Sequence, residues 1–297
     1  MTTMRVLGFG DNIVDRFVDR GVDYPGGNAV NVAVYARRLG AQAEYLGVFG
    51  DDELGGFLRA SIEAAGVATA RSVVRRGESG VSSLRVVDGD RVFLGWNGGG
   101  VTVRDPIDLD GGRDDYLAGF DLVHSSVYSG TESVLPRLRT RRPLVSFDLS
   151  SEPEFRTPEY LDRVAPHCDV VLFSCAGLDE SASFALLDEA VRRGAGLALG
   201  TRGTDGALTT DGRVHRTAPA RVVAPDAEIV DTMGCGDAFM AGFLVSLYAS
   251  GWRRDRRPDA AALQSALDAG ADAAHDQCFV EGAFGHGRPT PAAASMW

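Results

Sequence analysis

The sequence predicts an α/β fold: a three-layer sandwich with a mostly parallel central sheet and a small β lid. From about residue 119 onward, short apolar segments of strand length alternate with longer segments of helical periodicity. Strands that are separated by helices pair in parallel through right-handed crossovers, and the helices then cover both faces of the sheet. Two earlier segments, at about 12–25 and 80–101, alternate polar and apolar residues, which predicts a separate small sheet.

The N-terminal third contains the first strands and helices. Apolar runs that end in glycine turns predict the strands, and apolar residues at helical spacing predict the helices. Asp-Gly between two alternating segments predicts a hairpin turn, because it favours the positive φ that such turns need. We expect strands at 4–10 and 43–50, helices at 29–39 and 52–65, and a hairpin turn at Asp88-Gly89.

The remaining chain continues the alternation. We expect strands at 121–124, 144–148, 169–173, 197–200 and 207–210, and helices at 131–139, 158–165, 178–193, 236–250 and 259–274. No internal repeat or low-complexity tract divides the sequence, so we expect a single catalytic domain over residues 1–297. The lid is expected over the carboxyl ends of the strands, where open α/β sheets bind ligands.

Composition limits the classes of function. The net charge of −11 argues against general nucleic-acid binding, which needs a basic surface. No apolar stretch approaches the roughly 20 residues of a membrane span, and the start of the chain is not typical of a signal peptide, so we expect a cytoplasmic protein. The 4 cysteines form no C-x-x-C pair, so neither a zinc site nor a disulfide framework is indicated.

The chain contains no lysine, since all 30 basic residues are arginine. A Walker-type P-loop, the ATP site of protein kinases, a Schiff-base aldolase and a pyridoxal-phosphate enzyme all require lysine. All four are therefore excluded. A protein of this composition would have to bind phosphates with backbone N–H groups, arginine and metal.

The segment Asp231-Thr232-Met233-Gly234-Cys235-Gly236-Asp237 precedes a long apolar run. That run predicts a buried helix, so Gly234 to Gly236 would lie at a helix N-terminus, where backbone N–H groups lack partners and the dipole is positive. The glycines let a ligand approach these donors, which predicts an anion site built from backbone. Asp237 beside it could take a proton from a hydroxyl during phosphoryl transfer. Alone, the motif would also fit an ordinary helix start.

Two signatures resemble those of the ribokinase-like (PfkB) carbohydrate kinases. Gly26-Gly27-Asn28-Ala29-Val30-Asn31 with Arg38-Leu39-Gly40 is similar to the N-terminal signature of this family, and Asp231 to Asp237 is similar to the C-terminal one. Gly47-x-x-Gly50-Asp51-Asp52 fits the same family. Within it, short segments such as Gly10 to Asp15, Asp90 to Phe93 and Gly282 to Gly285 are most similar to fructoselysine 6-kinases.

The resemblance implies MgATP-dependent phosphorylation of a primary hydroxyl, most simply the 6-hydroxyl of fructoselysine or a related Amadori sugar. Asp237 would be the base, and the N–H groups of Gly234, Cys235 and Gly236 the anion hole. The sugar would be bound by Asp11, Asn12, Asp15, Gly26, Gly27, Asn28 and Asn31, with Arg91 and His124 nearby. ATP would be bound by Thr201, Gly203, Gly206, Asp231 and Thr232. The family also implies a homodimer formed through the lid.

Two positions depart from the family pattern. The family's Asn-x-x-Glu motif, which organises Mg²⁺, retains its glutamate as Glu180, but Gly177 stands where asparagine is expected. Cys235 replaces a small alanine in the anion hole. Since a helix N-terminus lowers the pKa of a thiol, we expect Cys235 to react with thiol reagents.

Other functions stay open at this point. Within the class, a kinase for fructose, ribose or a nucleoside is the alternative. Gly8-Phe9-Gly10 after a first strand would suit a nucleotide-dependent oxidoreductase, although the third glycine of that motif is missing. A non-catalytic sugar or nucleotide sensor is a third possibility, against which the retained Asp237 and its flanking glycines argue.

Overall fold

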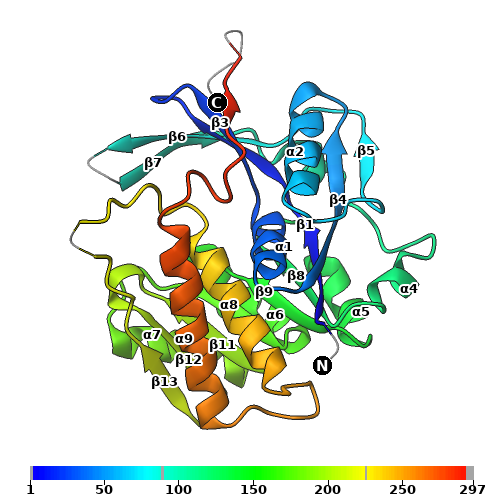
Figure 1. Cartoon of the computed structure of the whole chain (residues 1–297). Helices are drawn as coiled ribbons and strands as arrows, with labels where there is room; N and C mark the ends of the chain where they lie inside the picture. The colour runs from blue at the N-terminus through cyan, green and yellow to red at the C-terminus, as the bar shows by residue number, and fades with distance from the viewer. Residues whose placement is uncertain (1–2, 88–89, 225, 292–297) are drawn as a thin grey trace.

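The computed structural model of the chain describes residues 3–87, 90–224 and 226–291. A nine-stranded sheet forms its centre, in the order β13-β12-β11-β10-β9-β8-β1-β4-β5 (Figure 1). All pairings from β11 to β5 are parallel, and β12 and β13 are antiparallel additions at one edge. The strands are β1 (Arg5–Gly10), β4 (Gln42–Gly50), β5 (Val73–Arg75), β8 (Leu122–Ser126), β9 (Leu144–Asp148), β10 (Val170–Ser174), β11 (Leu197–Thr201), β12 (Ala207–Thr210) and β13 (His215–Ala218).

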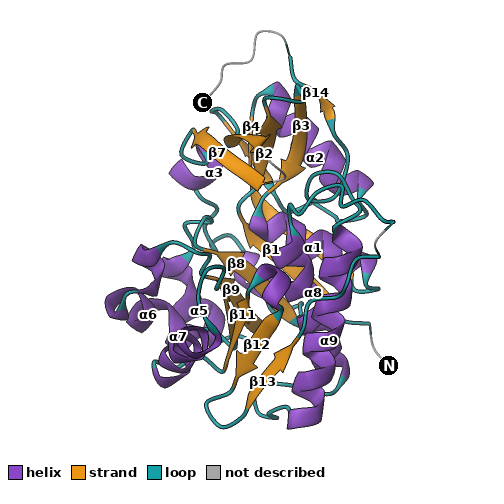
Figure 2. Cartoon of the chain, turned by 90° about the vertical axis from the view of Figure 1, so that its left-hand side faces the viewer, coloured by secondary structure: helices purple, strands orange, loops and turns teal. Residues whose placement is uncertain are grey.

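Helices cover both faces of this sheet, which confirms the predicted three-layer fold (Figure 2). One face carries α1 (Asn28–Arg38), α2 (Glu53–Ala64), α8 (Cys235–Ala249) and α9 (Ala260–Gln277); the other carries α3 (Gly100–Arg104), α4 (Arg113–Leu117), α5 (Leu135–Arg139), α6 (Pro158–Val164) and α7 (Glu180–Arg192). Alternation within the strands separates the two cores: Val6 packs with α8 and α9, while Leu7 and Phe9 pack on the opposite side. Short 3₁₀ turns lie at Glu132–Val134, Pro153–Arg156, Ala165–His167 and Gly203–Asp205.

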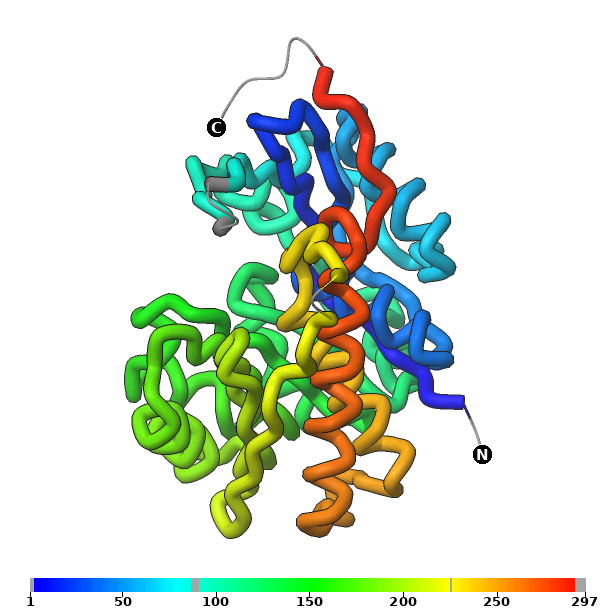
Figure 3. Tube along the Cα trace, turned by 60° about the vertical axis from the view of Figure 1, so that its left-hand side comes forward, coloured from blue at the N-terminus to red at the C-terminus, as the bar shows by residue number. Residues whose placement is uncertain are grey.

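A second, smaller sheet stands above one end of the first, in the order β14-β3-β2-β6-β7. Its strands are β2 (Ile13–Phe17), β3 (Val22–Gly26), β6 (Val81–Val87), β7 (Asp90–Trp96) and β14 (Arg288–Pro289). Strands β6 and β7 pair antiparallel, and the turn expected at Asp88-Gly89 lies outside the described residues. Figure 3 shows the C-terminal segment running beside the β2–β3 hairpin, where β14 pairs with β3.

The small sheet is attached to the main body by its own apolar core. Phe17 and Tyr24 of the hairpin meet edge to face at 5.3 Å and pack with Met233, Ala283 and Phe284. The segments that precede α8 and follow α9 therefore lie directly beneath this sheet, which places the start of α8 at its base.

The sequence analysis did not predict every strand or every strand pairing. Strands β11 and β12 pair antiparallel, because the few residues between them are too short for a crossover and instead make a turn, and the sheet from β11 to β5 is parallel, as the expected mostly parallel sheet allows. The short strands β5, β13 and β14 were not expected. Over the residues that the structure describes, no helix is long and apolar enough to cross a membrane.

Candidate active site

The site lies where the order of the large sheet reverses. Strand β1 has β4 on one side and β8 on the other, and open α/β sheets bind ligands at such a switch point, outside the carboxyl ends of the strands. Asp11 follows β1 at this edge, and Asp148 ends β9. The first residues of α1 and α8 also meet here, since Asn28 contacts Asp237. Two helix N-termini thus converge on one polar site, an arrangement suited to anions.

Asp237 lies in the first turn of α8, and both its carboxylate oxygens accept hydrogen bonds. Asn28 Nδ2 donates to Oδ1 at 2.8 Å, and Asn31 Nδ2 donates to Oδ2 at 2.7 Å. Burial raises the pKa of Asp237 well above its usual range, and the neighbouring carboxylate of Asp148 raises it further. Asn31 itself is buried, and its Oδ1 has no partner among the described residues. The site therefore presents a carboxylate poised to hold a proton beside an unpaired acceptor.

The sequence analysis expected His124 near the sugar, and the structure places it in β8 beneath Asn28. The ring is fully buried, and its nitrogens contact Ser146 Oγ at 2.9 Å and Asn28 Oδ1 at 2.8 Å. Burial lowers the pKa of His124 to about 3, so the ring is neutral. Both ring nitrogens are therefore occupied by protein partners, so His124 supports Asn28, and its contact with a sugar stays a prediction.

Asp11 and Asn12 also have structural tasks. Asp11 accepts from the backbone N–H of Asn28 at 2.5 Å and of Ala29 at 3.2 Å, and so caps the N-terminus of α1. Hydroxyl groups of two serines on the β8 side, Ser126 and Ser129, also donate to it.

Asn12 is buried, and its Nδ2 donates to Tyr45 Oη and to the Val48 carbonyl, both at 2.7 Å. These contacts occupy the donor groups that the sequence analysis assigned to a sugar. Asn12 therefore ties the end of β1 to β4, and its buried Oδ1, like that of Asn31, has no partner among the described residues.

Gly26 and Gly27 allow the close approach that the signature requires. A Cβ at Gly26 would lie 2.3 Å from Asp15 Oδ2, and a Cβ at Gly27 would lie 2.7 Å from the Cα of Asn12. Gly27 also has a φ of 113°, which side chains rarely adopt. Both glycines therefore serve to bring Asp11 and Asp15 against the start of α1.

Asp15 projects from β2 into the same region and is buried without a hydrogen bond among the described residues. Burial raises the pKa of Asp15 to about 7, while the Arg91 guanidinium partly opposes the rise. Arg91, on β7 of the small sheet, donates to Met233 Sδ at 2.9 Å. The small sheet therefore contributes one acidic and one basic side chain to the edge of the site.

The anion-hole segment has the expected turn. Gly234 caps α8 with a φ of 76°, and the Cys235 N–H donates to Thr232 O at 3.3 Å. One of the three expected donors is thus occupied. Asp231 accepts from Met233 N at 2.9 Å and Gly282 N at 3.2 Å, so it fastens the loop before α8 to the segment after α9, and its contact with ATP stays a prediction.

The sequence analysis expected the N-terminus of α8 to lower the pKa of the Cys235 thiol, but the structure raises that pKa. Its Sγ lies 3.7 Å from that of Cys278. Burial, followed by this neighbouring thiol, raises the pKa of Cys235 above its usual range. The loss of solvation outweighs the stabilisation of a thiolate by the helix N-terminus.

The residues expected to bind ATP and Mg²⁺ form a second group. Thr201 ends β11, Gly203 and Gly206 frame the following turn with φ values of 57° and 87°, and Glu180 begins α7 nearby. Arg202 lies 3.9 Å from Glu180. Among the described residues, no hydrogen bond joins this group to the Asp237 cluster, and no three acidic, histidine or cysteine side chains gather to hold a metal ion.

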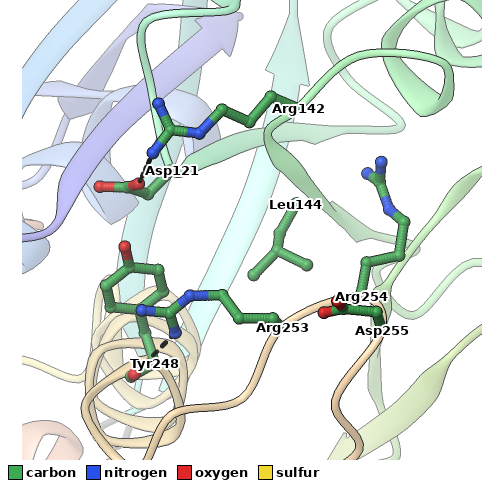
Figure 4. Close-up of a pocket in the computed structure, with 7 residues that line it drawn as sticks. All are labelled: Asp121, Arg142, Leu144, Tyr248, Arg253, Arg254 and Asp255. Carbon is green, nitrogen blue, oxygen red and sulfur yellow. Dashed lines mark hydrogen bonds and ion pairs between the residues drawn. The ribbon is translucent and has the colours of Figure 1, made fainter.

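A hollow of about 210 Å³ lies at the opposite edge of the sheet and is not part of this site (Figure 4). Its basic side chains are already paired: Arg142 with Asp121 at 3.3 Å, and Arg254 with Asp169 at 2.9 Å. Arg253 stacks on the ring of Tyr248. The hollow is lined by Asp121, Arg142, Leu144, Tyr248, Arg253, Arg254 and Asp255.

Comparison with known proteins establishes the family. A model of the pfkB family carbohydrate kinases matches residues 8–276. The chain belongs to the PfkB family. It is 37% identical over 287 residues to fructosamine kinase FrlD of Bacillus subtilis (strain 168), with 96% of this chain and 95% of that protein covered. It is 33% identical over 250 residues to fructoselysine 6-kinase of Escherichia coli (strain K12), with 82% and 88% covered.

Solved structures agree on the fold. Aminoimidazole riboside kinase from Salmonella enterica, complexed with aminoimidazole riboside and an ATP analog, has a TM-score of 0.70 at 24% identity, with 97% of this chain and 96% of that chain covered. A probable sugar kinase protein from Rhizobium etli CFN 42 has a TM-score of 0.74 at 21% identity, with 96% of each covered. The resemblance seen in the sequence is thus confirmed, and this PfkB protein is an ATP-dependent sugar kinase.

Asp148 and Ser146 are the site residues that the sequence analysis missed. Asp148 Oδ2 accepts from Asn28 Nδ2 at 2.7 Å, and Ser146 contacts His124. Burial raises the pKa of Asp148 to about 6, although a backbone N–H and Asn28 oppose the rise. The available signal was position: Asp148 is the last residue of an expected strand, and the carboxyl ends of parallel strands form the binding edge.

The two glycines that flank Cys235 should respond differently to substitution. A Cβ at Gly234 would lie 2.2 Å from Tyr35 Oη and require an unfavourable positive φ, whereas a Cβ at Gly236 would meet nothing within 4 Å. We expect Gly234→Ala to lose roughly 2–4 kcal/mol of unfolding free energy. Gly236→Ala should fold normally but place a methyl group beside the donors and lower kcat/KM for ATP roughly ten-fold or more. Urea unfolding and ATP kinetics on both variants check this, and equal stability losses would contradict it.

Proposed function

We propose that this PfkB kinase transfers the γ-phosphoryl group of MgATP to the 6-hydroxyl of fructoselysine or a related Amadori sugar. The observation that carries the proposal is the Asp237 carboxylate, held by Asn28 and Asn31 at the N-terminus of α8. The identities of 37% and 33% to a fructosamine kinase and a fructoselysine 6-kinase support the choice of acceptor.

The proposed base is Asp237. Phosphoryl transfer depends on positioning and on stabilising charge more than on covalent chemistry. The sugar hydroxyl would lie beside Asp237 and would give its proton to that carboxylate as the new P–O bond forms. The backbone N–H groups of Gly234 and Gly236 would stabilise the transferred group, with Arg91 approaching from the small sheet, while the Cys235 N–H donates to Thr232 O.

The residues present fit a nucleotide. The N-terminus of α8 offers open space at Gly236, and the turn at Gly203 and Gly206 follows a strand of the large sheet. Mg²⁺ bound to the phosphates would neutralise their charge during transfer. Glu180, whose side chain is 62% exposed, is the residue that would support the ion through water.

Recognition of the acceptor would depend on Asp15. This carboxylate is buried and lacks a hydrogen-bond donor among the described residues, so a ligand hydroxyl or ammonium group would satisfy it. A site built around such a group discriminates strongly against analogues that lack the donor. Asp15 and Gly26 thus mark the side of the site where the sugar would lie, under the small sheet.

A substrate panel tests the proposed acceptor. Coupled ADP release would be measured with MgATP and fructoselysine, fructose, ribose or a nucleoside. We expect kcat/KM for fructoselysine to exceed that for fructose by about 10²-fold, because the Amadori substituent adds contacts that fructose lacks. Turnover of ribose or a nucleoside without turnover of fructoselysine would assign the chain to another branch of the PfkB family.

We also propose a homodimer through the small sheet. Strand β7 is an edge strand, and Phe93, Leu94 and Trp96 on it are 63%, 43% and 52% exposed. Exposed apolar edge strands are commonly covered by a partner. We expect Phe93→Glu to shift the protein from dimer to monomer in light scattering, while Val74→Glu on the edge strand β5 leaves the mass unchanged. A wild-type monomer at micromolar concentration would refute the dimer.

A further inference from the structure

A chain of hydrogen bonds runs from strands β9 and β8 of the large sheet to the proposed base. Ser146 Oγ contacts His124 Nδ1 at 2.9 Å, and His124 Nε2 contacts Asn28 Oδ1 at 2.8 Å. The Nδ2 group of the same asparagine then donates to Asp148 at 2.7 Å and to Asp237 at 2.8 Å. One amide side chain therefore connects a buried histidine with two carboxylates.

The chemistry of the partners fixes the direction of each bond. The amide nitrogen of Asn28 donates and carboxyl oxygens accept, so the two protons of its Nδ2 group point at Asp148 Oδ2 and Asp237 Oδ1. The Oδ1 atom of Asn28 must then accept from His124, which places the single proton of the neutral ring on Nε2. Nδ1 is left as an acceptor for the Ser146 hydroxyl. Each group in the chain is therefore either a donor or an acceptor in each bond, and exchanging the two roles in any bond would break a hydrogen bond.

Asp148 and Asp237 are consequently held as a neighbouring pair of carboxyl groups. Both accept from the same nitrogen, and Asp148 is the charged neighbour with the largest effect on Asp237. The other groups that face Asp237 are Asn31 and Tyr35 from α1, Asp11 after β1 and Asp15 from β2.

We propose that Asp148 and His124 are positioning residues for the phosphoryl transfer: His124 orients the Asn28 amide, and that amide holds Asp148 beside Asp237 so that Asp148 sets the pH range in which Asp237 accepts a proton. This inference rests on the proposed role of Asp237 as the base. It adds two residues that need not touch either substrate.

The pH dependence of kcat tests the role of Asp148. Asp237 must be ionised to act, so kcat rises with pH along an acid limb. Removing the neighbouring negative charge in Asp148→Asn makes ionisation of Asp237 easier, because a like charge disfavours the charged form. We expect the acid limb to move to lower pH, with kcat on the plateau reduced by no more than about ten-fold. The matched control is Asp162→Asn on α6, which removes an exposed carboxylate whose partner is Arg193 and should leave the limb in place. An unmoved limb in Asp148→Asn would overturn the role.

A pair of substitutions at His124 tests the orientation of Asn28. His124→Leu removes both bonds at similar volume, whereas His124→Gln keeps a side-chain N–H that can donate to Asn28. We expect His124→Leu to lower kcat about 10²-fold with KM for ATP within two-fold of wild type, and His124→Gln to recover most of the loss. Ser146→Ala, which changes little volume, should lower kcat by a smaller factor. Thermal unfolding of each variant separates lost positioning from lost folding, and equal kcat in the Leu and Gln variants would contradict the proposal.

The two levels of proposal fail differently. If the wild-type enzyme phosphorylates no sugar of the panel, the proposed function is wrong, and the inference about Asp148 is wrong with it. If the wild-type enzyme turns over but the acid limb is unmoved in Asp148→Asn, the function stands and the inference about Asp148 is wrong.

Discussion

Asp237→Asn is expected to lower kcat for sugar phosphorylation by about 10²–10⁴-fold, which is the range for loss of a general base. The carboxamide keeps the shape of the carboxylate but cannot take the proton of the acceptor hydroxyl. The substitution should not unfold the protein, because burial and the neighbouring Asp148 both disfavour a charged side chain at position 237, and the carboxamide is neutral. One of its donors, Asn28 or Asn31, would lose an acceptor, at a cost of about 1–3 kcal/mol.

The measurement combines kinetics with binding. ADP release at saturating sugar gives kcat, and titration calorimetry gives the affinity for ATP, which should stay within a few-fold of wild type. Asp162→Asn is the matched control, since it makes the same chemical change at an exposed ion pair on α6. Turnover of Asp237→Asn close to that of the wild-type enzyme would remove Asp237 from the mechanism.

Asp15→Asn is expected to stabilise the free enzyme at alkaline pH and to impair sugar binding. The folded protein raises the pKa of Asp15 from 3.8 to about 7. Between these values the folded state binds more protons than the unfolded state, so the free energy of unfolding falls as pH rises. The protonated side chain is favourable at low pH, and this stabilisation is lost as pH rises through 7. From about pH 5.5 to about pH 8.5 we expect a loss of roughly 2 kcal/mol from this group.

Urea unfolding of both proteins across that range checks the expectation. The advantage of Asp15→Asn over the wild-type protein should grow with pH, and KM for the sugar should rise at least ten-fold at neutral pH because a buried acceptor is replaced. Asp162→Asn, at an exposed position, should show no such growth. A constant difference between Asp15→Asn and wild type at all pH values would show that Asp15 does not change its protonation on folding.

The fold could be predicted because short-range sequence patterns, apolar runs and strand–helix alternation, determine most of its elements. The apolar run after Gly234 is long enough to predict a buried helix, and strand–helix alternation after residue 119 leaves few arrangements other than a parallel sheet. The short strands β13 and β14 could not be predicted, because each is defined by its partner: β14 exists only where Arg288 pairs opposite Asp23.

The site was predictable in position but only partly in the role of each residue. Asn28 and Asp237 are 209 positions apart in the sequence, and the two family signatures predicted that both belong to one site. By contrast, the task of His124 depends on Ser146 lying beside it in the next strand, and that of Asp11 on Ser129, which is 118 positions away. A single sequence reports residue types and spacing; which polar side chains satisfy one another is decided by packing across strands.

The most direct test of the central claim is phosphorus NMR of the products formed from MgATP and fructoselysine. The account predicts one new phosphate monoester at carbon 6 of the sugar, formed in step with ADP by the wild-type enzyme and nearly absent with Asp237→Asn. Inorganic phosphate as the sole product, or an ester formed equally fast by both proteins, would contradict it.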